Sequence, residues 1–359
     1  MMMAQATRAA RAMRGTKAWG GLALIICCGC GQDPLQTDSE QSADPVAVGA
    51  LRPGPVAPTV LATAPDQEYL GDVAVVNGQV LFSGGRTVPH TPGPPYEQLG
   101  VVRSVPAQGG TVQEVWSGAG GGSDIAAGGG GIYFLAYDYF SRTGWLDRIA
   151  APGGAAVELG TWSSQGSTHS MAAEGQVAYW THSAGAASYV LRTNSADGTT
   201  VTLADSSTSG GGADDILFKT GFVYWFSRIG VYGVAAAGGA SFALYSSPQV
   251  AALGAAPSAE VLFAGVGGNL VGIETKGMFR TAVLVNGTDP IVAIAASDRA
   301  VYFGTWNVET ATGAVSRLAR TGAVTVIATG PIHPVAIAVD AASVYWADTL
   351  SMTVSRAPL

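Results

Sequence analysis

The sequence contains no cysteine after residue 30. Its three cysteines, Cys27, Cys28 and Cys30, lie close together near the start of the chain. The rest of the chain therefore has no disulfide bond and no cysteine-ligated metal site. Charged residues are also scarce, at 12% of 359 residues, whereas apolar residues make up 48%. This balance excludes a typical disordered chain and provides ample material for a core.

Several motifs that mark catalytic or nucleotide sites are absent. The sequence has no Gly-x-Ser-x-Gly elbow, no His-Glu-x-x-His pair and no P-loop. Its formal net charge is −7. Residues 1–29 carry four bases and no acid, so the chain beyond them is more acidic still. Because phosphate binding needs a basic surface, we expect no nucleic-acid partner.

The first 29 residues have the layout of a secretory signal peptide. Residues 1–17 are basic, and residues 18–28 form an apolar run too short to span a bilayer, which needs roughly 20 residues. Cys27-Cys28-Gly29-Cys30 resembles a bacterial lipobox, with Gly29 before the cleavage point and Cys30 as the lipidated residue. Cys27 stands where such boxes usually carry leucine. The resemblance implies export and lipid anchoring in the cell envelope, at the outer membrane or cell surface; an ordinary signal peptide with incidental cysteines is the alternative.

Residues 30–58 are polar and rich in proline, without apolar periodicity. This composition is typical of a flexible tether. We expect it to join the lipid anchor to a single domain that covers residues 59–359.

That domain is built from repeats marked by an apolar–aromatic pair. Successive pairs are 38 to 52 residues apart. They occur at Leu81-Phe82, Tyr133-Phe134, Tyr179-Trp180, Tyr224-Trp225, Leu262-Phe263, Tyr302-Phe303 and Tyr345-Trp346. In most units a strand of small apolar residues and a hairpin turn come before the pair, and two further strands follow it. A glycine-rich period of this length predicts propeller blades of four strands each.

The last unit ends after its third strand. Upstream of the first unit, Thr59-Val-Leu-Ala-Thr-Ala-Pro65 is similar to Thr325-Val-Ile-Ala-Thr-Gly-Pro331, which begins within a fourth strand. We therefore predict an all-β, seven-bladed β-propeller whose N-terminal strand completes the last blade. Six or eight blades are the alternatives, because residues 251–267 are irregular.

The motif Tyr345-Trp-Ala-Asp348 resembles the Tyr-Trp-Thr-Asp repeat of low-density-lipoprotein-receptor-type propellers. The units are also similar to NHL-type propellers and to repeat lipoproteins of bacteria with GC-rich genomes. The resemblance implies a propeller outside the cytoplasm. It implies little about activity, because these propellers serve many roles.

Polar residues recur at the start of the first strand in four units. Asp72, Asp124, Ser170 and Asp215 fall in one register, where the strand faces the mouth of the central channel. The candidate ligand-binding residues at this mouth are Asp72, Asp124, His169, Ser170, Asp214, Asp215, Asp289 and His333. Such oxygens could orient a polar ligand or hold a divalent cation. The alternative is structural: each Asp accepts backbone N–H groups and fixes blade to blade.

These observations favour a non-catalytic module, most simply a monomer, that binds a protein, glycan or small molecule. We predict no catalytic residue, no metal ligand and no cofactor, a divalent cation at the channel mouth being the open alternative. A metal-dependent lyase or hydrolase is the rival hypothesis. Streptogramin-type lyases have a similar seven-bladed ring with a metal and a histidine at its mouth, where the nearest equivalents here are His169, Asp124 and Asp215. A purely structural envelope lipoprotein is the third.

Overall fold

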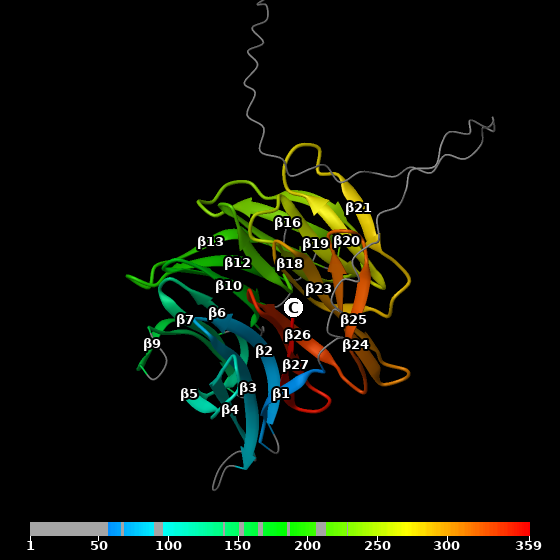
Figure 1. Ribbon diagram of the computed structural model, residues 1–359. Coiled ribbons are helices and arrows are strands. Elements are labelled where there is room, and N and C mark those ends of the chain that lie inside the picture. The colour runs from blue at the N-terminus through cyan, green and yellow to red at the C-terminus, as the bar shows by residue number, and fades with distance from the viewer. Residues whose placement is uncertain are drawn as a thin grey trace, which may run out of the picture. The chain divides into compact units, whose positions relative to one another are not determined.

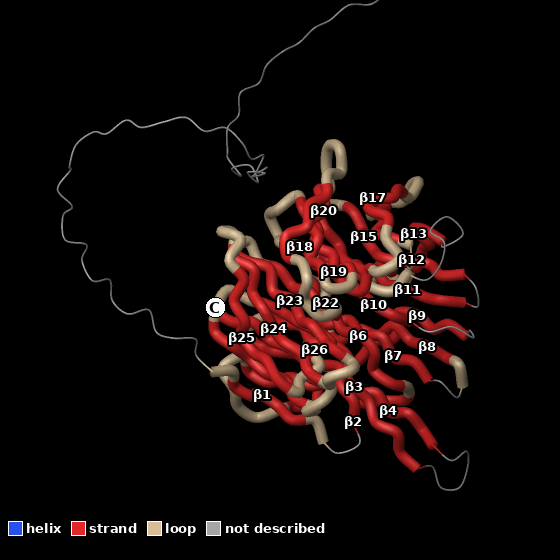
Figure 2. The backbone as a smooth tube through the Cα atoms, turned by 90° about the vertical axis from the view of Figure 1, so that its right-hand side faces the viewer, coloured by secondary structure: helices blue, strands red, loops and turns tan. Residues whose placement is uncertain are grey.

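The structure is a computed structural model that describes residues 57–65, 68–89, 96–138, 141–150, 154–163, 168–184, 187–205, 213–227 and 229–359. The predicted signal peptide, Cys30 and nearly all of the predicted tether lie outside these residues. Every regular element in the described part of the chain is a strand (Figure 2). None of the described segments forms a helix long and apolar enough to cross a bilayer.

The strands form seven antiparallel four-stranded sheets, arranged as the blades of a propeller around a central axis (Figure 1). Blade one contains β2 (Glu68–Val76), β3 (Gln79–Pro89), β4 (Tyr96–Pro106) and β5 (Gln113–Ala119). Blade two contains β6 (Gly121–Gly128), β7 (Gly131–Asp138), β8 (Thr143–Ile149) and β9 (Ala156–Ser163). Blade three contains β10 (Thr168–Glu174), β11 (Val177–Ala184), β12 (Ala187–Asn194) and β13 (Thr200–Asp205). Blade four contains β14 (Ile216–Lys219), β15 (Phe222–Ser227), β16 (Gly230–Ala235) and β17 (Phe242–Ser246).

The remaining three blades follow the same order, the first strand lying innermost. Blade five contains β18 (Val250–Ala255), β19 (Val261–Val266), β20 (Asn269–Glu274) and β21 (Thr281–Val285). Blade six contains β22 (Ile291–Ala296), β23 (Ala300–Asn307), β24 (Thr312–Ala319) and β25 (Val324–Gly330). Blade seven contains β26 (Pro334–Val339), β27 (Ser343–Asp348), β28 (Thr353–Pro358) and, as its outer strand, β1 (Thr59–Thr63).

The predicted closure of the ring by the N-terminal strand is confirmed. Strand β1 pairs antiparallel with β28, with Thr59 opposite Arg356 and Thr63 opposite Thr353. The Arg356 guanidinium also donates to the carbonyl of Ala107 in blade one, at 2.7 Å. In Figure 1 the blue strand β1 accordingly lies beside the red end of the chain. The seven-blade count, predicted with six and eight as alternatives, is confirmed as well.

The aromatic pair of each repeat explains how blades pack on one another. Successive residues of a strand point to opposite faces, so the two members of a pair serve different interfaces. In blade seven, Trp346 packs with residues of blade six such as Tyr302, whereas Tyr345 packs with residues of blade one such as Phe82. Both blade-seven side chains are at most 2% exposed. The pair thus connects its blade to both neighbours.

The aromatic pair predicted for blade five is one residue out of register. Leu253 of the inner strand lies opposite Ala264, as Ile294 lies opposite Phe303 in blade six. The pair equivalent to Tyr302-Phe303 is therefore Phe263-Ala264, not Leu262-Phe263. The aromatic marker misleads because alanine occupies the second position here, and a one-residue slip exchanges the two faces of a strand.

Candidate functional site

The inner strands line a central cavity, and one register position of each strand defines its character. In each inner strand, one residue lies opposite the second member of the aromatic pair, or opposite Ala264 in blade five. The position in question is the residue directly before it. From blade one to blade seven it is occupied by Asp72, Asp124, Ser170, Asp215, Ala252, Ala293 and Ala336. The first four blades therefore present oxygen-bearing side chains, and the last three present only methyl groups.

A break in the hydrogen-bond ladder contains this position or directly precedes it in every inner strand except β14. The register shifts, for example, between Leu70 and Val73 in β2 and between Gly122 and Asp124 in β6. A bulge re-aims the side chain next to it and bends its strand. In blade four, Asp215 comes directly before β14, and its carbonyl accepts the N–H of Phe226 at 3.2 Å. The local backbone thus sets these residues at the rim of the strand.

The carboxyl groups join successive blades through backbone N–H groups. Asp124 accepts the N–H of Ile125 in its own strand and the N–H of Met171 in blade three, both at 2.7 Å. Asp215 accepts the N–H of Ile216 at 2.8 Å and that of Leu253 in blade five at 3.1 Å. These contacts are those of the structural alternative, in which the Asp residues fix blade to blade.

Asp72 and Ser170 extend the same pattern. Asp72 accepts the N–H of Ile125 in blade two at 3.3 Å. The Ser170 hydroxyl accepts the N–H of Ile216 in blade four at 3.3 Å and donates to Asp215 at 3.0 Å. The chain of contacts therefore runs from blade one to blade five, and alanine supplies no such acceptor at the equivalent position in blades five to seven.

Two buried hydroxyl groups behind these residues were not identified from the sequence. The N–H of Asp72 donates to the Ser83 hydroxyl at 2.9 Å, and the N–H of Ser170 donates to the Thr181 hydroxyl at 3.1 Å. Both hydroxyl-bearing residues are fully buried. Their position in the sequence could have identified them, because each directly follows the aromatic pair on the second strand of its blade.

Burial governs the electrostatics of the carboxyl groups. Burial and the adjacent Asp72 carboxylate raise the pKa of Asp124 well above its usual range. Burial also raises the pKa of Asp72, while hydrogen bonds from Asp124 and from backbone N–H groups act to lower it. The two carboxyl groups are hydrogen-bonded to each other, and their mutual repulsion adds to the rise in the pKa of Asp124. Burial raises the pKa of Asp215 to about 6, although Leu253 and Ser170 donate hydrogen bonds to it.

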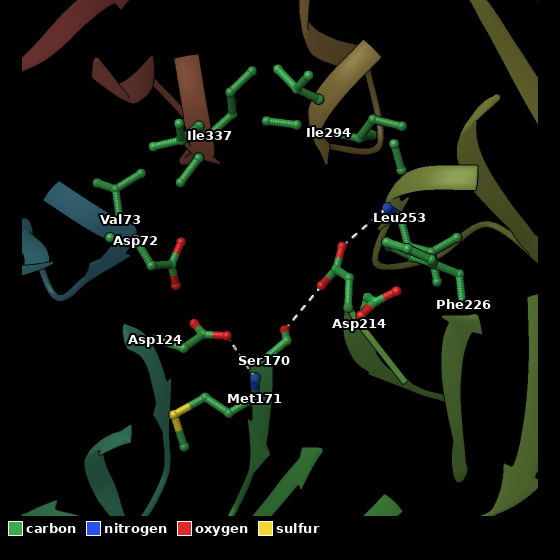
Figure 3. Close-up of a pocket in the computed structure, with 17 residues that line it drawn as sticks. Asp72, Val73, Asp124, Ser170, Met171, Asp214, Phe226, Leu253, Ile294 and Ile337 are labelled. Carbon is green, nitrogen blue, oxygen red and sulfur yellow. Dashed lines mark hydrogen bonds between the residues drawn. The ribbon is translucent and has the colours of Figure 1, made fainter. Parts of the chain in front are cut away.

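The cavity that these residues border has a volume of about 420 Å³. Figure 3 shows Asp72, Asp124 and Ser170 on one side of the opening and Ile294 and Ile337 on the other. The apolar lining includes Val73, Met171, Phe226, Leu253, Val292, Ile294, Val335 and Ile337. Blades one to four contribute every carboxyl and hydroxyl group of the lining, together with the apolar Val73, Met171 and Phe226, and form its polar half. Every lining side chain from blades five to seven is apolar, and these blades form the apolar half.

The structure brings five of the eight candidate residues together at this cavity: Asp72, Asp124, Ser170, Asp214 and Asp215. Asp289 and His333 are not among the residues that line it. Asp289 accepts a hydrogen bond from Asn307 at 2.8 Å, and the ring of His333 stacks on Trp306. His169 belongs to β10, but its side chain lies outside the described part of the structure.

No metal centre is apparent among the side chains that the structure describes. These hold no group of three or more His, Asp or Glu residues arranged to bind an ion. The carboxyl groups at the cavity instead bond to backbone N–H groups and to each other.

No protein-family model matches the sequence. No curated protein matches it either. Solved structures do match the fold. A catalytically inactive variant of virginiamycin B lyase from Staphylococcus aureus, solved with quinupristin, is similar with a TM-score of 0.64 and 13% identity, over 83% of this chain and 98% of that one.

Two further matches come from proteins of different origins. The β-propeller domain of the Trilobed protease from Pyrococcus furiosus, which has an open velcro topology, gives a TM-score of 0.58 and 10% identity over 82% of this chain and 94% of that one. The computationally designed Ika8 protein gives a TM-score of 0.53 and 12% identity, over 84% of this chain and 98% of that one. At such identities these likenesses establish the fold alone, and a propeller is compatible with many functions. The chain is a seven-bladed β-propeller.

Proposed function

We propose that this protein is a non-catalytic binding module of the cell envelope, exported and held to a membrane by a lipid on Cys30. Its ligand is a small amphipathic molecule that enters the central cavity. The polar end of the ligand, a hydrogen-bond donor or an amine, contacts the half bordered by Asp72, Asp124, Ser170 and Asp215. Its apolar part lies against the half bordered by Ala293 and Ala336.

The division of the cavity into these two halves is the observation that carries the proposal. A cavity of about 420 Å³ is within the size range of small-molecule sites, which combine apolar walls with a few convergent polar groups. A positively charged group near Asp72 and Asp124 would offset the repulsion between their carboxyl groups. On the opposite side Ala293 and Ala336 leave room that larger side chains would fill.

The lyase hypothesis has weaker support. His333, a histidine whose side chain the structure describes, lies outside the cavity lining, and its Nδ1 is 3.0 Å from the Thr349 hydroxyl. Asp124 and Asp215 use their oxygens to bind backbone N–H groups of neighbouring blades. His333 therefore does not lie where a general base for a substrate in the cavity would have to be, and the backbone contacts explain the two carboxyl groups without proton transfer.

A thermal-shift screen of small amphipathic amines and alcohols would test the proposal. We expect a hit to stabilise the protein and to lose affinity in Ala293→Leu, which fills the apolar half without touching a carboxyl group. Equal affinity for the wild type and Ala293→Leu would refute binding in the cavity. Mass spectrometry of the hit after long incubation should return it unchanged, and chemical conversion would refute the non-catalytic role.

Mass spectrometry of the mature N-terminus would test the anchor separately. We expect the chain to begin at Cys30 and to carry a diacylglycerol-type modification. An unmodified start at another residue would refute lipid anchoring at Cys30, and would leave the prediction about the cavity standing.

A further inference from the structure

A second cavity lies at the rim of blade six, beside the central one. It has a volume of about 500 Å³ and is lined by Pro290, Val292, Trp306, Asn307, Val308 and Glu309. Val292 lines both cavities, which places them next to each other. The lining residues come from the segment that enters β22 and from the end of β23 with the turn that follows it.

Trp306 lines this cavity, and its side chain is half-buried. Its ring stacks on that of His333, with ring centroids 4.5 Å apart and planes inclined by 26°. His333 is itself held by Thr349, whose hydroxyl is 3.0 Å from Nδ1, and by the Asp348 carboxylate, which accepts its backbone N–H at 2.8 Å. His333 does not line the cavity. His333 therefore covers one face of the indole from outside the cavity, while Trp306 itself borders the cavity.

The surroundings of this ring are acidic and apolar. Glu309 is exposed at the cavity edge, and the Asp289 carboxylate is bonded to Asn307, which lines the cavity. Val308 is 79% exposed and adds an apolar surface to the same edge. No lysine or arginine is among the lining residues. Burial lowers the pKa of His333, partly opposed by Asp348, which favours the uncharged imidazole beside the indole.

We propose that the Trp306 cavity binds a methylated ammonium group. An ammonium over the face of a tryptophan is attracted by the ring quadrupole, and tryptophan is the strongest such ring. The carboxylates of Glu309 and Asp289 offset the positive charge. The methyl groups of the ligand contact Val292, Val308 and Pro290. This site is separate from the ligand proposed for the central cavity and does not depend on it.

Calorimetric titration of the full chain with choline chloride would test this site. The neutral probe 3,3-dimethylbutan-1-ol has the same shape as choline but no charge, so it isolates the electrostatic contribution. We expect choline to bind about tenfold more tightly than the alcohol. A tenfold ratio corresponds to about 1.4 kcal/mol, which lies within the range of cation–π contacts. Equal affinities would overturn the proposal.

Three variants locate the site. Trp306→Leu removes the π face and should weaken choline binding about tenfold or more, whereas Trp306→Phe should retain part of it. Glu309→Gln changes an exposed side chain, is expected to fold normally and should weaken binding by roughly threefold. Asp72→Asn changes a residue that borders the central cavity and not the Trp306 cavity, and should leave the affinity of the Trp306 cavity for choline unchanged. If choline binding were lost in Asp72→Asn but normal in Glu309→Gln and Trp306→Phe, the cation would bind in the central cavity. That result would overturn this proposal and favour an amine ligand for the central cavity.

The source of the group can be distinguished in the same system. Co-flotation with phosphatidylcholine vesicles, but not with phosphatidylglycerol vesicles, would identify a lipid headgroup. Binding of free choline without flotation would identify a soluble ligand. Absence of both would overturn the proposal.

Discussion

The strongest test of the electrostatics described above is the pH dependence of stability in Asp215→Asn. Burial raises the pKa of Asp215 from 3.8 to about 6. Because the folded state holds the proton more tightly than the unfolded state, this carboxyl group favours folding most at pH values below 3.8. That stabilisation is lost as the pH rises through 6. The amide introduced by Asp215→Asn cannot titrate, so the variant lacks this dependence.

The magnitude follows from the size of the shift. Each pKa unit corresponds to about 1.4 kcal/mol, so a shift of roughly two units, sampled between pH 7.5 and pH 4, amounts to about 2 kcal/mol. The free energy of unfolding of the wild type, minus that of Asp215→Asn, should therefore increase by about 2 kcal/mol as the pH falls over this range. Urea unfolding followed by circular dichroism at several pH values measures this difference.

Comparison with a surface residue provides the control. Hydrogen bonds from Thr199 lower the pKa of the exposed Asp197. The difference between wild type and Asp197→Asn should therefore change in the opposite direction, with the stabilising contribution of Asp197 lost as the pH falls. A difference for Asp215→Asn that stays constant or decreases from pH 7.5 to pH 4 would refute the view that burial dominates at the cavity.

Three further changes probe the scaffold. Deleting residues 59–63 leaves blade seven without its outer strand, and we expect loss of cooperative urea unfolding and aggregation by size-exclusion chromatography; a monomer with unchanged unfolding would contradict this. Arg103→Ala removes the partner of Glu68, which is 5% exposed, and should lower the free energy of unfolding by about 3–5 kcal/mol, with Arg103→Lys intermediate. Gly230→Ala brings a Cβ within 2.0 Å of a carbonyl oxygen at a φ of +154°, and should lower the melting temperature more than Gly221→Ala, where φ is +82° and the space is open.

The fold could be predicted from the sequence because the repeats carry redundant information. Each blade must bury an aromatic pair against both neighbours, so the pair recurs even where surrounding residues differ. The similarity between residues 59–65 and 325–331 identified the closing strand, which pairs with β28. The pair predicted for blade five is shifted by one residue, because Ala264 stands where the other blades have the second residue of the pair. Only the hydrogen-bond ladder shows the correct register of this strand.

The candidate site could be predicted only in part. The common register of Asp72, Asp124, Ser170 and Asp215 follows from the repeat, because equivalent positions in equivalent blades converge on one axis. The contacts of each carboxyl group could not be predicted from the repeat, because they depend on how neighbouring inner strands are offset. Trp306 was missed because it lies beyond the aromatic pair, where the sequence gives no sign that His333 from the next blade covers one side of its ring.

The pairing of β1 with β28 has a consequence for the order in which the protein can fold. Strand β1 is synthesised first among the described strands, and its partner last, so it must remain unpaired until the whole propeller has been made. Contacts between such distant parts of a chain form slowly, because closing a long loop costs entropy before the pairing stabilises it. During this interval the unpaired edges of β1 and β28 are open to other chains. We therefore expect maturation to be limited by this final pairing, and a chaperone that shields strand edges to increase the yield of folded protein.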